Sequence, residues 1–449
     1  MASAAEQLAA NINFSAFGKA TELKQRLWFT LGALLIYRLG TYIPIPGIDP
    51  AALKQIFDQN AGGILGIFNM FSGGALGRMT ILALNITPYI SASIIIQLLT
   101  AIVPSLETLK KEGEAGRKRL NQYTRYGTVV IAVFQAFAIA GGLESMRGGG
   151  GVSAVIDPGL AFRLVTTITL VGGTIFLMWL GEQITARGVG NGTSLIIFSG
   201  IVANMPAAGG HMLELVRTGD INPLFAGAFL ILAVAVIGFI VFMERAQRRL
   251  LVQYPKRQHG NKQFGGEASH LPLKMNTSGV IPPIFASSLL LLPASIAGFQ
   301  AAQGSDGWLA TIVSYVAHGK PLYMVLYVAM IMFFSFFYTA VVFNPTETAD
   351  NLRKYGGFIP GIRPGKNTAD YLDYVLTRLT VVGAAYLSVV CVLPEILTSQ
   401  YNVPFYFGGT SLLIVVSVTM DTVAQVQGYL LAHQYEGLIK RSKLRGRRR

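Results

Sequence analysis

The sequence predicts an all-α polytopic membrane protein that crosses the bilayer ten times, with both termini on the cytoplasmic side. Of its 449 residues, 52% are hydrophobic and only 13% are charged, and the mean hydropathy is +0.50. Soluble proteins carry roughly 25% charged residues, so this chain has too little charge to cover a surface in water. The net charge of +14 must therefore be concentrated in the loops.

Ten segments are apolar enough to span a bilayer, which takes about 20 mostly apolar residues per helix. They lie near residues 24–43, 78–103, 126–143, 164–181, 193–209, 223–243, 276–298, 321–343, 375–397 and 407–430. The ten segments form two tandem halves of five, residues 24–209 and residues 223–430, which an external hinge loop at 210–222 connects.

The lysines and arginines of the loops orient the chain, because cytoplasmic loops are enriched in these residues. The loops after spans two, six and eight are basic, as is the tail at 431–449. The intervening loops hold little more than Arg147, Arg217 and Lys320. The N-terminal segment 1–23 falls on the basic, cytoplasmic side. Two cytoplasmic loops are long, at about 244–275 and 344–374, and the first has the pattern of a hairpin.

The loop between spans one and two contains an apolar segment at 61–74, AGGILGIFNMFSGG, that is too short to span. Segments of this length are often re-entrant or interfacial, and backbone at membrane depth is tolerated where protein buries it. A loop that lies on the outer lipid surface is the alternative, and the pattern does not decide between the two.

The two halves contain a weak internal repeat. Because five spans is an odd number, tandem halves have opposite orientations, an arrangement in which the functional path usually lies at their interface. Span two carries Pro88-Tyr89-Ile90-Ser91-Ala92-Ser93, and span seven carries Pro282-Pro283-Ile284-Phe285-Ala286-Ser287. These two helices also hold small polar residues, which could equally be ordinary contacts between helices: Ser91, Gln97, Asn276 and Ser287.

The chemistry of an enzyme is not evident in this sequence. Span two has no ionisable side chain other than tyrosine from Met79 to Leu106, and the single cysteine, Cys391, lies in an apolar run. We find no nucleophile with a base, no phosphate-binding loop and no metal-ligand spacing, so we expect no catalysis, cofactor or metal. A passive conduit is the leading interpretation, and a secondary transporter of a small solute is the alternative.

Long stretches of the sequence are similar to the SecY family, the central subunits of the bacterial Sec protein translocase. Residues 77–99, GRMTILALNITPYISASIIIQLL, and residues 177–198, LMWLGEQITARGVGNGTSLIIF, resemble its two signature sequences. Further similar runs include HLPLKMNTSGVIPPIFASS at 270–288 and FIPGIRPGKNT at 358–368, and the resemblance covers nearly the whole chain in order. The chain departs from the family pattern at Asn85, where glycine is usual, and at Asn261, where a basic residue is common.

The resemblance implies an hourglass pore between two inverted, pseudo-symmetric halves. Its constriction would be a ring of Ile86, Ile90, Ile197, Ile284 and Ile414. A short plug helix would close the outer side of the ring with Ile64, Leu65, Ile67, Phe68, Asn69, Met70 and Phe71. A lateral gate between spans two and three and spans seven and eight would include Ser91, Gln97, Asn276 and Ser287.

The resemblance also implies function and partners. The channel would pass unfolded preproteins across the bacterial inner membrane and release membrane helices into lipid. SecA, the ribosome and the membrane potential would supply the energy, and Arg257, Lys262 and Arg363 would dock SecA or the ribosome. Other expected partners are SecE and SecG in a heterotrimer, signal sequences, anionic lipids at the basic tail, and other insertion factors.

Overall fold

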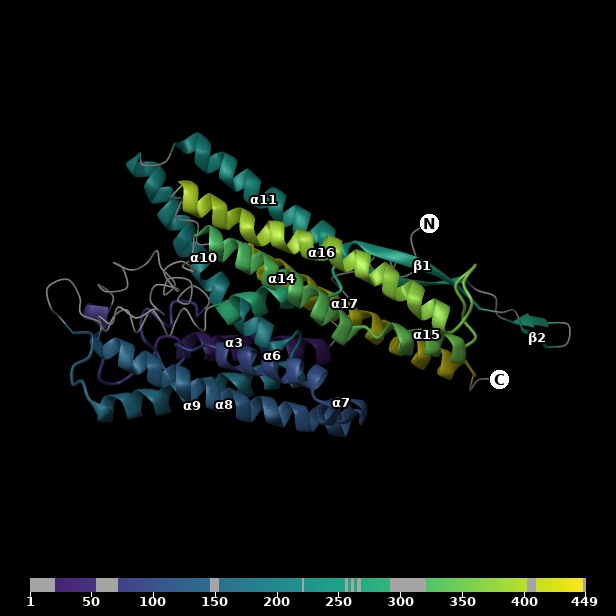
Figure 1. The fold of residues 1–449 in the computed structure, drawn as a ribbon, viewed down its shortest axis with the longest axis horizontal. Helices are drawn as coiled ribbons and strands as arrows, with labels where there is room; N and C mark the ends of the chain where they lie inside the picture. Colours follow the sequence, from purple (N-terminus) through teal and green to yellow (C-terminus); the bar gives the residue numbers. More distant parts are fainter. Residues whose placement is uncertain are drawn as a thin grey trace.

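The computed structural model describes residues 21–53, 72–145, 153–219, 222–254, 257–259, 262–264, 268–290, 320–401 and 409–446. These residues form a bundle of long helices with two short antiparallel ribbons at one end (Figure 1). The helices of the first half are α3 (Thr21–Gly40), α6 (Thr87–Ile102), α7 (Pro104–Lys111), α8 (Glu114–Ser145), α9 (Leu160–Arg187) and α10 (Gly192–Thr218). Those of the second half are α11 (Pro223–Arg245), Ile281–Leu290, α14 (Pro321–Val342), α15 (Pro345–Lys354), α16 (Lys366–Tyr401) and α17 (Gly409–Gly446).

The described helices fit a protein that crosses the membrane many times. Seven helical stretches are long and apolar enough to span, and they overlap predicted spans three to six and eight to ten. The bent pair of α6 and α7 would make an eighth. Of the other two predicted spans, the first coincides with α3, and the seventh contains the short helix Ile281–Leu290. Each of the ten predicted segments therefore contains a described helix.

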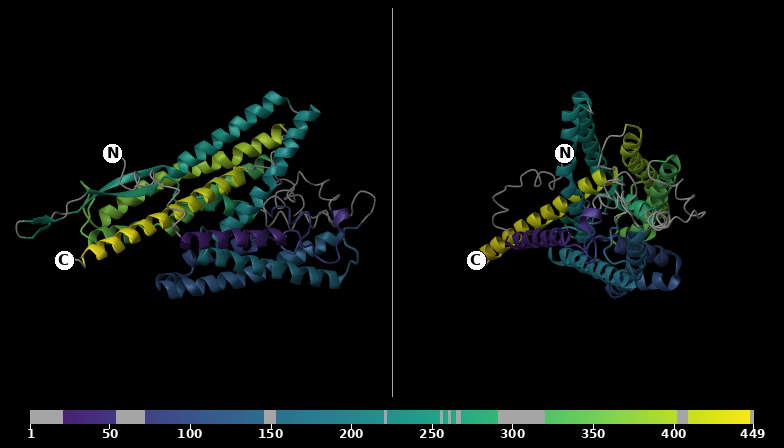
Figure 2. Two further views of the ribbon diagram at one scale, coloured as in Figure 1. Left: turned by 180° about the vertical axis from the view of Figure 1, so that it is seen from behind. Right: turned by 90° about the vertical axis from the view of Figure 1, so that its left-hand side faces the viewer.

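The two halves of the chain form two layers (Figures 1 and 2). Helices α3, α6, α8 and α9 lie together on one side, and α11, α14, α16 and α17 lie on the other. Helix α10 contacts α9 and α3 in the first layer and α17 in the second. The start of α3 also meets α17, where the guanidinium of Arg26 lies 5.1 Å from the centre of the Tyr429 ring. These contacts join the two layers along one edge of the molecule.

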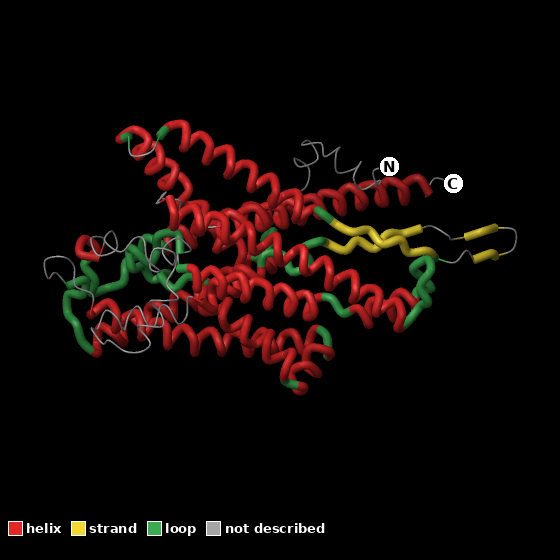
Figure 3. Tube along the Cα trace, turned by 45° about the horizontal axis from the view of Figure 1, so that its top comes forward, coloured by secondary structure: helices red, strands yellow, loops and turns green. Residues whose placement is uncertain are grey.

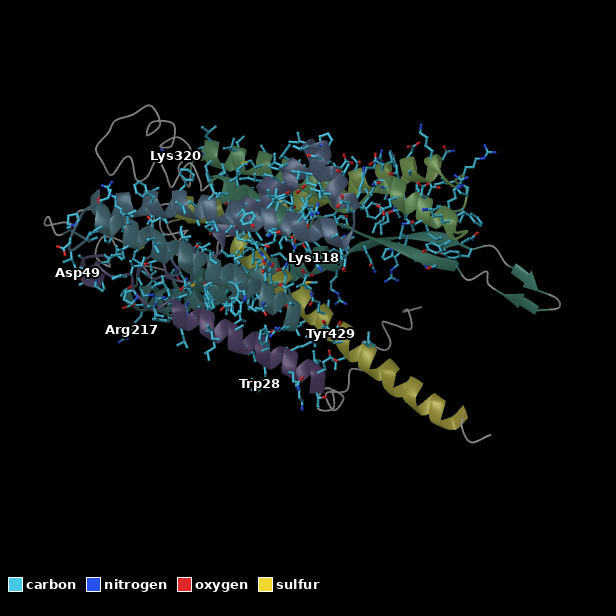
Figure 4. The ribbon with its side chains drawn as sticks, turned by 90° about the horizontal axis from the view of Figure 1, so that it is seen from below. Trp28, Asp49, Lys118, Arg217, Lys320 and Tyr429 are labelled. Carbon is cyan, nitrogen blue, oxygen red and sulfur yellow. The ribbon has the colours of Figure 1, made fainter. Side chains whose placement is uncertain are left out.

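The loops gather at two ends of the molecule in the predicted alternation. Figure 4 places Asp49, Arg217 and Lys320, from three loops that the charge pattern assigns to the outer side, at one end. The β ribbons and the end of α17 lie at the opposite end (Figure 3). The helices thus run back and forth between two ends, as the distribution of basic residues predicts.

Span two, predicted at 78–103, is only partly helical. Residues 73–79 and 81–86 are turns, and α6 begins only at Thr87, with a proline in its first turn. At its other end, Val103 takes an extended conformation before Pro104, and the axis bends by 99° into α7. Proline favours the first turn of a helix and disfavours a helical residue before it, which explains where both breaks lie.

The hinge loop predicted at 210–222 is mostly helical, which corrects its bounds. Helix α10 continues to Thr218, where Gly219 ends it with φ +85°, and the side chain of Asn222 caps the start of α11. The loop at 344–374 is also partly helical, since α15 lies within it and α16 begins at Lys366. Helix α17 likewise extends through most of the basic tail.

The hairpin predicted in the loop after α11 is confirmed. Strand β1 (Gln247–Gln253) pairs with β4 (Ala268–Lys274) in antiparallel register, and β2 (Arg257–His259) pairs with β3 (Lys262–Phe264). A bridge between Gln253 and Phe358 joins this hairpin to the other long loop. Both loops share a small apolar core with the start of α16, built from Leu250, Val252, Leu273, Ile359, Leu372, Val375, Leu376 and Leu379. The two predicted loops are therefore one folded projection.

Candidate pore constriction and lateral seam

The five isoleucines predicted to form the ring lie in one hydrophobic cluster, which we call the isoleucine girdle. Ile86 and Ile414 are 1% exposed, Ile197 is buried, and Ile90 and Ile284 are partly buried against the others. They come from the start of α6, from α10, from the helix Ile281–Leu290 and from α17. Both halves of the chain therefore contribute to the girdle, and the pair that the internal repeat aligned, Ile90 and Ile284, lies within it.

A strained turn presents Ile86 to the girdle. Asn85 has φ +51° and Met79 has φ +45°. Glycine adopts such left-handed conformations freely, but few L-residues other than asparagine do so. Both side chains are buried. The left-handed backbone at position 85 suits the glycine that the resemblance leads us to expect there, and asparagine is a tolerable replacement because it also adopts this conformation.

Neighbouring backbone holds this turn in place. The amide of Ile45 donates to the carbonyl of Met79 at 3.0 Å, and the amide of Ile81 donates to the carbonyl of Ile43 at 3.0 Å. On the other side, Gly173 of α9 lies so close to the carbonyl of Ile81 that a Cβ would sit 1.9 Å from its oxygen. The two hydrogen bonds give backbone groups of the turn partners outside a helix, and the close approach of Gly173 packs α9 against it.

The plug residues predicted at 64, 65 and 67–71 lie outside the described residues, but the end of that segment is visible. Gly73 and Gly74, at φ +67° and +84°, pack against α10. The guanidinium groups of Arg38 and Arg78 donate to the carbonyl of Gly73 at 2.9 and 3.2 Å, and both lie beside the ring of Tyr42. These contacts fix the backbone at Gly73 and Gly74.

The contact between α6 and the second half is apolar. Ile94 is 2% exposed within a cluster that includes Phe285, Leu290 and Phe334, and Ile90 and Leu98 pack against the same cluster. Residues four apart lie on one face of a helix, so these three side chains form a stripe. We call this contact the lateral seam. It meets the girdle at Ile90, which belongs to both clusters.

Of the four polar side chains predicted for the lateral gate, three make hydrogen bonds within their own halves. Gln97 donates to Ser93 at 3.1 Å, and Ser287 donates to the carbonyl of Ile284 at 3.0 Å. Asn276 donates to Glu244 at 2.7 Å, and Ser91 is buried on α6. Sequence reasoning missed Ile94 and Leu98 because it searched for polar groups. The spacing of four between Ile90, Ile94 and Leu98 is the signal that could have found the stripe.

The predicted docking residues lie on the folded projection. Arg363 is exposed in the turn before α16, where its carbonyl accepts a hydrogen bond from Thr368 at 3.0 Å. Arg257 lies on β2 and Lys262 on β3, where Lys262 pairs with His259. Asn261 lies outside the described residues.

The chemistry of the girdle is that of a barrier. Aliphatic side chains offer no hydrogen bonds to water or ions, and an apolar constriction closes a pore by dewetting. Only non-covalent contacts hold these side chains together, so they can move apart to admit something larger than water.

Comparisons with known proteins agree with this architecture. A family model described as SecY matches residues 80–423. The protein translocase subunit SecY of Rickettsia conorii is 58% identical over 424 residues, which cover 94% of this chain and 97% of the relative. The corresponding Escherichia coli protein is 55% identical over 432 residues, with coverage of 96% and 97%.

Solved structures share the fold at lower identity. One described as the structure of a protein conducting channel has a TM-score of 0.64 at 18% identity, over 91% of this chain and 92% of that chain. Sec61 in a canine ribosome–channel complex from the endoplasmic reticulum has the same TM-score, identity and coverage. Because the family model matches most of the chain and relatives are more than half identical over nearly all of it, this chain is a member of the SecY family.

Proposed function

We propose that this protein is the channel-forming subunit of a bacterial Sec translocase. It passes unfolded preproteins across the inner membrane and releases transmembrane segments sideways into lipid. The observation that carries the proposal is the isoleucine girdle, in which both halves of the chain meet through five aliphatic side chains. Membership of the SecY family supports the same function.

The girdle acts as a seal that a polypeptide can open. At rest the aliphatic side chains exclude water and ions. An unfolded chain that enters from the cytoplasmic side pushes them apart, and they close around it again as it leaves. The protein makes no covalent change to its substrate; SecA, the ribosome and the membrane potential supply the energy.

The lateral seam is the route into lipid. Because the stripe of Ile90, Ile94 and Leu98 meets an aliphatic and aromatic surface, opening it exposes apolar side chains that a hydrophobic signal sequence can cover. An apolar substrate helix therefore replaces the contacts that opening breaks, whereas a polar segment does not. Ser91, Gln97, Asn276 and Ser287 lie near this route and tune it.

The basic residues at one end of the molecule indicate where its partners bind. The projection that carries Arg257, Lys262 and Arg363 docks SecA or the ribosome on the cytoplasmic side, where both termini lie. A Sec61 relative in a ribosome–channel complex supports this assignment. SecE and SecG complete the heterotrimer, and the basic tail contacts anionic lipid.

Single-channel recording tests the proposal. The reconstituted protein is expected to conduct almost no ions at rest and to open widely when the plug segment, residues 61–74, is deleted. Unchanged conductance after the deletion contradicts the plug and the pore together. A secondary transporter of small solutes, the alternative function, predicts ion flux that depends on a solute, and the family relationship lends it no support.

A further inference from the structure

Helix α14 ends without a basic residue of its own. Its last turn holds Thr339, Ala340, Val341 and Val342, and no lysine or arginine lies there. The last carbonyls of a helix have no intrahelical partners and carry a partial negative charge that a nearby cation stabilises. The amide of Phe343 satisfies the carbonyl of Thr339 at 3.0 Å, which leaves the carbonyl of Val341 to another donor.

That donor comes from the other half of the chain. The ammonium group of Lys110, near the end of α7, donates to the carbonyl of Val341 at 3.3 Å, although the two residues are 231 positions apart. Helix α7 follows α6 after a 99° bend, and it packs beside α8 (Figure 1), from where the Lys110 side chain reaches the end of α14. Lys110 therefore supplies the cation that the last turn of α14 lacks.

The contact lies at the cytoplasmic end of the lateral seam. Helix α6, which continues into α7, packs through Ile94 on a cluster that also contains Ile331 and Phe334 of α14. The aliphatic stripe and the Lys110 contact thus join the same two parts of the chain. The Lys110 contact is a direct hydrogen bond between α7 and α14.

We propose that Lys110 is a gating residue: its ammonium group caps α14 across the lateral seam and holds the gate closed at its cytoplasmic end. The inference rests on the proposed channel function and adds to it a specificity-determining residue. Separation of α7 from α14 breaks the contact and leaves the end of α14 without its cation. The contact therefore raises the hydrophobicity that a substrate segment needs before it opens the gate.

The adjacent Lys111 provides a matched control. It lies on the same helix, carries the same charge, and pairs with Glu107 of its own helix at 2.7 Å. Its removal changes the charge of α7 as much as the removal of Lys110 does but leaves the contact with α14 intact. Both lysines are exposed, so neither substitution disturbs a core.

The test uses the full-length protein with its Sec subunits in vesicles, and model segments of alanine with increasing leucine content. The measurement is the ratio of inserted to translocated segment. For segments of intermediate hydrophobicity, Lys110→Gln is expected to raise this ratio about two- to fivefold, the size of one exposed charge at a helix terminus. Lys110→Arg and Lys111→Gln are expected to behave as the wild type, and Lys110→Glu to raise the ratio further.

Salt separates an electrostatic cap from a steric effect. As the ionic strength rises above about 0.1 M, where the Debye length is about 10 Å, the difference between wild type and Lys110→Gln is expected to narrow. If the wild type is active and the ratio of inserted to translocated segment is the same for it, Lys110→Gln and Lys111→Gln, the proposed cap is overturned. The channel function stands in that case. A wild type that inserts no segment overturns the channel function, and the cap with it.

Discussion

The carboxamide nitrogen of Asn276 lies 2.7 Å from Oε1 of Glu244, and this hydrogen bond ties the start of span seven to the C-terminal end of α11. The same nitrogen donates to the carbonyl of Gly279 at 3.0 Å, and the carboxamide oxygen accepts from Ser278 at 3.0 Å. Asn276 is 3% exposed. The residue thus organises the turn that precedes the helix carrying Ile284.

Removal of the acceptor should destabilise this turn. We expect Glu244→Leu to cost about 1–3 kcal/mol, because the buried carboxamide loses a partner that water cannot replace. Glu244→Gln keeps an acceptor oxygen and should cost less. Thermal unfolding of the purified protein in detergent measures both, with Glu214→Leu at an exposed position of α10 as control. Equal melting temperatures for Glu244→Leu and the control would show that the hydrogen bond contributes nothing.

The close approach of α9 to the non-helical turn makes Gly173 sensitive to substitution. In Gly173→Ala the new methyl group would meet the carbonyl of Ile81, so we expect a loss of about 1–3 kcal/mol from overpacking. The neighbouring Gly172 has open space around it, and Gly172→Ala should be neutral or gain up to about 1 kcal/mol from helix propensity. Thermal unfolding distinguishes the pair, and a Gly173→Ala protein as stable as Gly172→Ala contradicts the packing described for α9.

A polar side chain in the girdle should weaken the seal. Ile414→Asn places a hydrogen-bonding group where a fully buried isoleucine now excludes water, so the resting conductance should rise and signal-sequence selectivity should relax. The conservative control is Ile414→Val, which keeps the surface apolar. Export of a preprotein with a defective signal sequence is the readout; if Ile414→Asn exports no more of it than Ile414→Val, this residue is not part of the seal.

The left-handed backbone of Asn85 predicts which substitutions it tolerates. Glycine adopts φ +51° freely, so Asn85→Gly should remain folded and active. Valine is β-branched and strongly disfavours this conformation, so Asn85→Val should lose about 1–2 kcal/mol. Melting temperatures of the two variants report the difference. A Val variant as stable as the Gly variant would mean that the turn relaxes out of its left-handed conformation.

Because Arg363 is exposed, its substitution can test partner docking without disturbing the fold. Because its side chain is exposed, Arg363→Glu should leave the protein stably inserted and yet reverse a charge that a partner would contact. Motor-driven preprotein transport into reconstituted vesicles should fall, while Arg353→Glu, an exposed charge reversal on α15, should have a smaller effect. Normal transport by Arg363→Glu would remove this residue from the docking surface.

Sequence-based prediction was most successful for topology. Hydropathy is a property of each segment on its own, and the cost of placing lysine and arginine in lipid or on the outer side acts on each loop separately. The spans, the alternation of loops between two ends and the hairpin after α11 were therefore predictable. The resemblance to a known family then nominated five isoleucines that no hydropathy pattern could have selected.

By itself, then, the sequence determined a membrane protein of many helices with basic loops on one side. Only the tertiary structure decided that Ile90 and Ile284 share a cluster, that Ile94 and Leu98 line the seam, and that Lys110 caps α14. Residues 72–86 show the reason most clearly. They are apolar enough for a helix, but they form turns whose Met79 and Ile81 hydrogen-bond to the backbone of Ile45 and Ile43. A contact between distant segments cannot be derived from the local pattern of either.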